Sequence, residues 1–346
     1  MWEAKGDHRK PAEPRDRKGL GSSLEVHPRC TFPDVSYHET KHIANVCFLA
    51  ALALLTSCAR GAHTPSPNAG SARTVRLEAG TVPTRMYAGG AQCAGRPTMM
   101  VHAYNADFYI LRQPACTNYE KPFLYLIFGS RRALLLDTGA GGLDVAASVD
   151  SIVQAWRARH AKRPIELVVA HSHAHADHVA GDSLFRGKPN VALVGRDTAA
   201  VRAFFSIAQW PQDSAVFDLG DRVVDVLPIP GHQPASIAIY DRRTGVLLTG
   251  DTFYPGRLYV RDTAAFVRSV QRLVTFTKTH PISHLLGAHI ENSDVPFRDY
   301  AVGTVNQPRE HGLALTVANL RTLDSALTPM RGRFVRTVLP DFTIWP

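Results

Sequence analysis

The chain has 346 residues, of which 45% are apolar and 20% charged, a composition typical of a globular protein rather than of a disordered or fibrous one. This length suits one large α/β domain with an N-terminal extension. The formal net charge is +9, but the basic residues are spread along the chain, so we expect no nucleic-acid partner. The longest apolar run, from Ile43 to Leu55, is too short for a membrane span of about 20 residues, which excludes a polytopic membrane protein.

The N-terminal segment has the pattern of an export signal. The apolar run ends in Leu55-Thr56-Ser57-Cys58, which resembles the lipobox of bacterial lipoprotein signal peptides. That resemblance implies cleavage before Cys58, a lipid anchor on Cys58, and a location in the bacterial cell envelope facing the periplasm. Residues 1–57 would then be a leader. Its polar first part is long for such a leader, so either the true start lies downstream or the leader is extended.

After Cys58, residues 58–97 are expected to form a tether and N-terminal extension, since they begin with a stretch rich in Gly, Ser, Pro and Ala. Of the five cysteines, Cys93 and Cys116 remain once the leader and Cys58 are set aside. A pair in an oxidising compartment suggests one disulfide. Two independent buried thiols are the alternative.

The elements of the folded part follow from apolar runs and their spacing. Residues 123–128 and 133–136 predict two buried strands joined by a hairpin, and residues 143–159 predict a helix. A compact strand at 167–170 leads straight into a His-rich loop. Further along, the pattern predicts strands at 191–194, 223–229, 236–240, 246–248 and 284–286, and helices at 263–279 and 309–327. This is a mixed α/β pattern, with polar clusters at strand ends where such proteins usually build their sites.

The segment from His171 to Asp177-His178 carries the strongest chemical signal. His173 and His175 are alternate residues on an extended loop, so both can project to one side and meet one metal ion. Asp177 and His178 then turn toward a second metal ion. We expect His171, on the strand side of this loop, to pack or orient neighbours rather than to bind metal.

Three further segments each place a side chain that can bind metal just past a predicted strand. They are Pro230-Gly231-His232, Thr249-Gly250-Asp251 and Gly287-Ala288-His289. In each, a small residue beside the ligand allows close approach. Tyr254 and Tyr259 follow Asp251 on a predicted loop, where they are either plain loop aromatics or substrate contacts.

Together these motifs resemble the metallo-β-lactamase superfamily, whose signature is HxHxDH followed by a lone His, a bridging Asp and a final His. The resemblance implies an α/β fold, an αββα sandwich over residues 98–330 with a dinuclear metal site at one edge of the sheets, and a C-terminal tail at 331–346. It implies one metal on His173, His175 and His232, and another on Asp177, His178 and His289, with Asp251 bridging both. Asp137, in the family's DTG element, would orient ligands rather than bind metal.

Imidazole and carboxylate ligands without thiolate suit Zn²⁺ best, with iron or manganese as alternatives, and two ions per chain are expected. Two such cations can hold a hydroxide at neutral pH, and Asp177 can orient it and pass its proton to the leaving group. The leading hypothesis is therefore an envelope hydrolase that cleaves an ester, lactone, thioester or amide bond of a small molecule. β-Lactam hydrolysis is the first alternative, although Asp251 stands where β-lactamases of the family usually carry Cys or Ser. A non-catalytic metal-binding protein and a mono-iron sulfur dioxygenase are the others.

Overall fold

The computed structural model describes residues 76–86, 89 and 98–346. The leader, Cys58 and Cys93 lie outside these residues. Cys116 is in a disulfide, and its predicted pairing with Cys93 stays a prediction. Within the part described, no helix has both the length and the apolar character that crossing a membrane requires.

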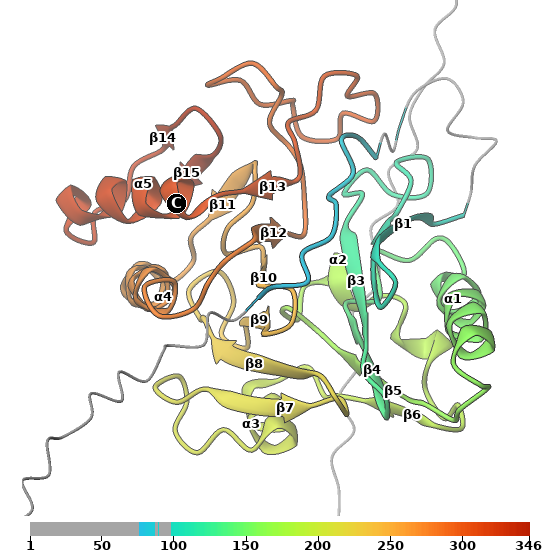
Figure 1. Ribbon diagram of the computed structural model, residues 1–346. Coiled ribbons are helices and arrows are strands. Elements are labelled where there is room, and N and C mark those ends of the chain that lie inside the picture. Colours follow the sequence, from blue (N-terminus) through green and yellow to red (C-terminus); the bar gives the residue numbers. More distant parts are fainter. Residues whose placement is uncertain (1–75, 87–88, 90–97) are drawn as a thin grey trace, which may run out of the picture. The chain divides into compact units, whose positions relative to one another are not determined.

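Two six-stranded sheets form the centre of the domain (Figure 1). The first runs in the order of the sequence: β1 (Met100–Asn105), β2 (Phe108–Arg112), β3 (Phe123–Phe128), β4 (Arg132–Leu136), β5 (Glu166–Ala170) and β6 (Val191–Leu193). The second has the order β13 (Ala314–Leu315), β12 (His284–Gly287), β10 (Val246–Gly250), β9 (Ile237–Asp241), β8 (Val223–Pro228) and β7 (Ala215–Asp218).

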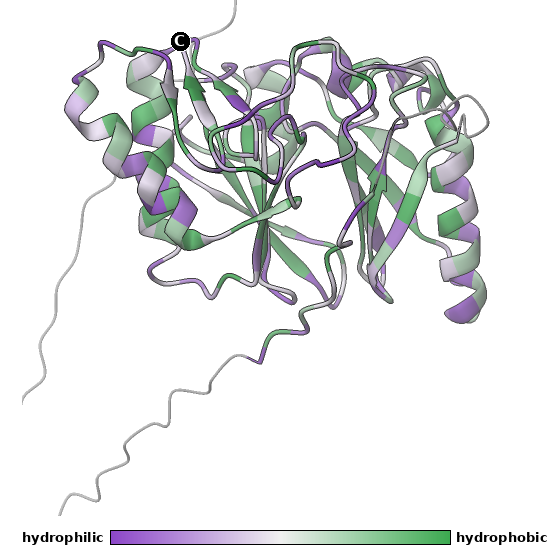
Figure 2. Cartoon of the chain, turned by 90° about the horizontal axis from the view of Figure 1, so that it is seen from above, coloured by the Kyte–Doolittle hydropathy of each residue, from purple (hydrophilic) through white to green (hydrophobic). Residues whose placement is uncertain are grey.

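Helices cover the outer faces of both sheets. Helix α1 (Val145–Arg159) lies on the first sheet, and α4 (Thr263–Phe276) and α5 (Val317–Leu327) lie on the second (Figure 1). Shorter helices are α2 (Ala176–Val179) and α3 (Thr198–Phe205), with single 3-10 turns at Asp182–Leu184 and Thr328–Met330. Seen from above, the strands are mostly apolar while the helices mix apolar and polar residues (Figure 2). The predicted αββα sandwich is confirmed.

The alternating direction of side chains along the strands explains why the sheets are covered on both faces. In β4, Leu134 and Leu136 face the core between the two sheets, whereas Ala133 and Leu135 face the core beneath α1. Because successive side chains of a strand point to opposite faces, a run that is apolar throughout must be covered on both sides. The predicted hairpin of residues 123–128 and 133–136 is confirmed by the antiparallel pairing of β3 with β4.

Two expectations were wrong at the C-terminal end. The helix expected from Arg309 starts only at Val317, because Thr316 and Asn319 form a capping box there and Glu310 is drawn into a buried ion pair with Arg112. The segment 331–346 is not a separate tail. Its strands β14 (Thr337–Val338) and β15 (Thr343–Trp345) form a third sheet with β11 (Arg257–Tyr259).

A buried ion pair joins the two sheets at the edge where β3 ends and β4 begins. Arg222 donates from Nε to Asp241 Oδ1 over 2.9 Å, and from Nη1 to the carbonyl oxygens of Asp107 and Phe128 at 2.9 and 3.1 Å. Both charged side chains are fully buried. The guanidinium therefore links Asp241 of the second sheet to turns of the first.

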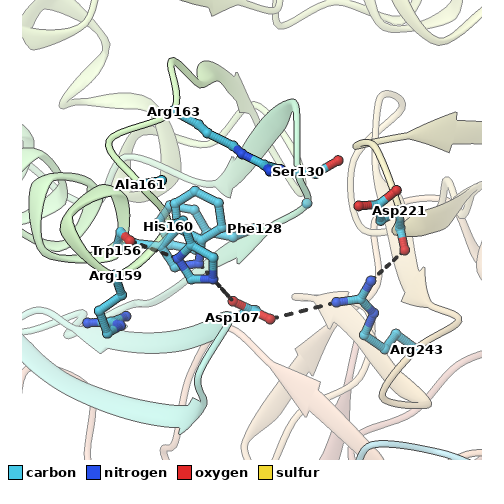
Figure 3. Close-up of a pocket in the computed structure, with 11 residues that line it drawn as sticks. Asp107, Phe128, Ser130, Trp156, Arg159, His160, Ala161, Arg163, Asp221 and Arg243 are labelled. Carbon is cyan, nitrogen blue, oxygen red and sulfur yellow. Dashed lines mark hydrogen bonds and ion pairs between the residues drawn. The ribbon is translucent and has the colours of Figure 1, made fainter.

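The same edge carries a pocket of about 370 Å³ (Figure 3). The ring of Trp156 stacks between Phe128 and His160, with centroids 4.8 and 3.9 Å away. Its indole Nε1 donates to Asp107 Oδ1 over 2.7 Å, and Arg243 Nη1 lies 3.7 Å from the other oxygen of that carboxylate. The Asp107 carboxylate thus holds the end of α1 against the turns of the sheets.

Replacing Arg222 by Met should lower the free energy of unfolding by about 3–5 kcal/mol, because it leaves the Asp241 carboxylate buried and unpaired. Arg309→Met is the matched control, since both side chains of the Arg309–Asp294 ion pair are exposed; its cost should stay below about 1 kcal/mol. Urea unfolding of both variants measures this, and equal small losses would contradict the role assigned to Arg222.

Candidate metal centre

All seven predicted metal ligands follow strands at one edge of the two sheets. The loop after β5 carries His173 and His175 and leads into α2, which holds Asp177 and His178. In the second sheet, His232 comes after β8, Asp251 after β10 and His289 after β12. Because β10 and β12 are parallel neighbours, their ends bring Asp251 and His289 together.

One group of ligands consists of His173, His175 and His232. The Nε2 atoms of His173 and His232 each lie 3.0 Å from Nδ1 of His175. A tetrahedral zinc ion with bonds of 2.0–2.1 Å would place its ligand nitrogens about 3.3 Å apart, close to these separations. A single Nδ1 cannot form good hydrogen bonds with both neighbours at once, so the three nitrogens are arranged as a ligand set rather than as a hydrogen-bonded cluster.

The second group consists of Asp177, His178, His289 and Asp251. Asp177 Oδ2 lies 3.2 Å from Nε2 of both His178 and His289, and those two nitrogens are 3.2 Å apart. Within each group the candidate ligand atoms lie within 4.8 Å of one another. The structure therefore brings together every residue that the sequence motifs nominated.

Asp251 lies between the two groups. Its Oδ2 is 3.8 Å from His173 Nε2 and 3.7 Å from His232 Nε2, while its Oδ1 is 3.5 Å from Nε2 of both His178 and His289. Oδ1 is buried and accepts no hydrogen bond from any residue the structure describes. A buried carboxylate oxygen without a donor costs free energy, which a cation at this position would remove. The residues present thus fit a metal site.

In several of the ligand histidines, the ring nitrogen that points away from the ligand group, Nδ1, lies at hydrogen-bond distance from an oxygen acceptor. His232 Nδ1 lies 2.8 Å from the carbonyl oxygen of Tyr259, and His289 Nδ1 lies 2.9 Å from that of Glu120. His178 Nδ1 lies 2.9 Å from Asp137 Oδ2. An Nδ1–H that donates to these oxygens leaves Nε2 with a free lone pair, directed at the ligand group.

Asp137 directly follows β4 and organises the loop that carries the motif. Its carboxylate accepts hydrogen bonds from the backbone N–H of Ser172 at 2.7 Å and from the Ser172 hydroxyl at 2.8 Å, besides its contact with His178. The backbone of Asp137 has a φ of 71°, in the left-handed region. Strain of this kind is kept only where the surroundings fix it, as the contacts to Ser172 and His178 do for Asp137.

The histidines of the two groups differ in the direction of their pKa shifts. Burial holds the pKa of His173, His175 and His232 below the ordinary value. Burial alone would also lower the pKa of His289, but Asp251 and Asp177 outweigh it and raise that pKa to about 9. The pKa of His178 is raised in the same way by Asp251, Asp137 and Asp177. Despite burial, the facing histidines hold the pKa values of Asp177 and Asp251 well below the usual range.

His171 and Tyr254, which lie near the ligands in the sequence, have structural roles. His171 is buried and its Nε2 lies 2.8 Å from Asp182, away from both ligand groups. Tyr254 is buried too, and its hydroxyl donates to the carbonyl of Arg257, so it packs rather than contacting substrate. Sequence reasoning missed Ser172 and the carbonyls of Glu120 and Tyr259. Ser172 could have been noticed inside the motif, but nothing in a sequence marks a backbone carbonyl.

Comparisons with known proteins point in one direction. Residues 121–279 match the metallo-beta-lactamase superfamily. The chain is 28% identical over 203 residues to acyl-coenzyme A thioesterase MBLAC2 of Homo sapiens, an alignment covering 48% of this chain and 72% of that protein. It is 25% identical over 220 residues to hydroxyacylglutathione hydrolase of Aeromonas salmonicida (strain A449), covering 60% of this chain and 79% of that one.

Among solved structures, a metallo-beta-lactamase from Pontibacter korlensis is similar with a TM-score of 0.44 and 16% identity, over 67% of this chain and 99% of that chain. The matched segment 121–279 contains six of the seven candidate ligands, all except His289. Residues 121–279 are thus a segment of the metallo-β-lactamase superfamily, and the two relatives that the chain resembles are a thioesterase and a hydrolase.

Proposed function

We propose that this protein is a dinuclear-metal hydrolase that cleaves acyl thioesters. The observation that carries the proposal is Asp251, which turns one carboxylate oxygen toward each ligand group. Support for the thioester comes from the two relatives, whose names describe acyl groups on coenzyme A and on glutathione, both thiols. In the reaction, water adds its hydroxyl to the acyl carbon, the carbon–sulfur bond breaks, and the products are a carboxylate, a thiol and a proton.

Two Zn²⁺ ions are the proposed cofactor. The ligands are five imidazoles and two carboxylates with no thiolate, a set that suits zinc and also accepts iron or manganese. When bound, such ions supply Lewis acidity and lower the pKa of a water molecule to about 7. His173, His175 and His232 would hold one ion, Asp177, His178 and His289 the other, and Asp251 both.

Asp177 is the ligand carboxylate placed to move a proton. Its side chain is 22% exposed, against 9% for Asp251, so it faces the open side of the site. Its low pKa keeps it ionised, and an ionised carboxylate can orient a water molecule and accept its proton. Transfer of that proton to the leaving sulfur would complete the cycle, and Asp137 keeps His178 aligned while it happens.

The first test is thiol release by the full chain reconstituted with zinc. A simple acyl thioester, S-acetyl-N-acetylcysteamine, should be cleaved, and a chelator should abolish the cleavage. Asp251→Ala and His173→Ala should each lose metal and at least about 100-fold in kcat/KM, since each removes a ligand. His102→Ala is the control, because His102 lies in β1 and its Nε2 contacts the carbonyl of Thr81. Full activity with unchanged metal content in Asp251→Ala would overturn the assignment.

Metal binding to the second group should release protons. Without metal, Asp251 and Asp177 raise the pKa of His289 to about 9, which keeps this ring protonated at pH 7, and the ring must lose its proton from Nε2 to bind metal. The affinity of this group should therefore rise with pH toward about 9, while the group around His173 changes little near neutrality. Calorimetric titrations in buffers of different ionisation enthalpy count the protons, and no release at pH 7 would contradict the protonated state of His289.

We also propose that Cys58 carries a lipid anchor and that the enzyme works in the bacterial cell envelope, a proposal that rests on the lipobox resemblance alone. Cells fed a radiolabelled fatty acid should label the wild-type protein and leave Cys58→Ser unlabelled. Cys47→Ser is the control, since Cys47 belongs to the predicted leader. Equal labelling of wild type and Cys58→Ser would remove the anchor.

A further inference from the structure

A cavity of about 640 Å³ opens beside the candidate metal centre, and the ligand His232 forms part of its wall. The cavity lies between the loop 230–234, the first half of α4 and the segment 210–212. Trp210, Pro211, Pro230, Pro234 and Ala265 provide apolar surface. A molecule bound at the metals therefore has a partly apolar space into which it can extend.

Three arginines line this cavity: Arg261, Arg268 and Arg272. Arg268 and Arg272 are four residues apart on α4, so they lie on one face of the helix. Arg261 and Arg268 are exposed and Arg272 is half-buried. The guanidinium of Arg261 lies 5.7 Å from the ring of Tyr259, the residue whose carbonyl holds His232.

None of these three guanidiniums pairs with a carboxylate among the residues that the structure describes. Asp262 also lines the cavity, but its Oδ1 accepts the N–H of Ala265 as the cap of α4. Asp213 acts on Arg272 only from beyond ion-pair distance. The cavity therefore carries a net positive charge whose guanidiniums have no ion-pair partner, whereas in the pocket at the opposite edge Arg243 pairs with Asp107.

The charge reaches the metal centre. The backbone N–H of Arg261 donates to the carbonyl oxygen of Gly231 at 2.9 Å, and Gly231 directly precedes the ligand His232. Arg268 and Arg272 extend the positive charge away from this point along α4. An anion that these arginines hold can therefore be part of a molecule whose other end lies at the metal centre.

We propose that this cavity binds the phosphate-bearing end of the substrate's leaving group. This rests on the proposed hydrolase function and specifies its substrate. The guanidinium plane matches a phosphate with two parallel hydrogen bonds, and several unpaired cations around one cavity favour a polyanion. A glutathione thioester has a net charge of only about −1, because its ammonium offsets one of its two carboxylates. A leaving group with several phosphate charges complements three arginines better.

Two sources share this chemistry: a soluble phosphorylated thiol such as coenzyme A, and a phosphorylated glycerolipid. The apolar walls accept the uncharged arm that joins the phosphate to the scissile bond in either one. Each has a counterpart that carries the same bond without phosphate. These are S-acetyl-N-acetylcysteamine for acetyl-coenzyme A, and 1-monoacylglycerol for 1-acylglycerol 3-phosphate.

The test compares kcat/KM within each pair for wild type and for the double variant Arg268→Ala/Arg272→Ala, both as full chains loaded with zinc. In the pair that matches the natural source, the wild type should prefer the phosphate-bearing member, and the double variant should lose at least about tenfold of that preference, mainly through KM. The preference should also fall as salt concentration rises. Arg321→Ala, which removes an arginine from α5, is the control and should leave the ratio unchanged.

The proposal would be overturned if, for both pairs, the ratio of kcat/KM between the phosphate-bearing and the phosphate-free member were the same in wild type and in the double variant. The proposed function is judged separately, by cleavage of the phosphate-free thioester and its loss in Asp251→Ala. If no thioester is cleaved, calorimetric binding of two acyl-free probes still decides: adenosine 3′,5′-bisphosphate for the coenzyme A source and glycerol 3-phosphate for the glycerolipid source. Binding of either probe that the double variant loses supports the cavity as a phosphate site, and no binding of either probe to wild type rejects it.

Discussion

The carboxylate of Asp251 is the constraint on which the metal centre depends. It lies at the end of a buried strand with one oxygen toward each group of imidazoles, in surroundings where an isolated charge would be unstable. Histidines of both sheets compensate this charge, and those histidines are themselves fixed through Asp137 and two backbone carbonyls. The two halves of the sandwich therefore have to meet in one register for the site to exist.

That register comes from packing. A core between the sheets, and one beneath the helices on each side, fill both faces of nearly every central strand, so the strand ends have little freedom. At the opposite edge, Arg222 fastens the sheets together through Asp241 and two turns. At the edge that holds Arg222, the buried charges pair with one another within the protein. At the edge of the metal centre, the charged side chains are available to bind ligands. The same fold can in this way be rigid as a scaffold and still reactive at its loops.

Much of this was predictable from sequence because it depends on local pattern. The apolar runs that became β3, β4, β5 and β10 are continuous and short, the run of β8 is interrupted only by Asp225, and each ligand lies shortly after a strand, so both the sandwich and the ligand set could be inferred. The start of α5 could not, because Glu310 is removed from a helical pattern by Arg112, nearly two hundred residues earlier in the chain. Nor could the strand nature of 343–345, where a three-residue run gains its partner β11 only in the folded chain. The arginine-lined cavity was missed for a similar reason, since Arg261 and Arg272 look like ordinary surface residues until Trp210 and the 230–234 loop enclose the space beside them.

The pairing of β15 with β11 has a consequence for how the enzyme matures. Residues 257–259 receive their partner strand from residues 343–345, and the same segment supplies the Tyr259 carbonyl that orients His232. During synthesis β15 leaves the ribosome after all seven candidate ligands, the last of which is His289. The first metal group therefore gains this support only after residues 343–345 have been made, so a nascent chain that stops short of β15 would carry every candidate ligand and yet lack the strand that holds the Tyr259 segment in place.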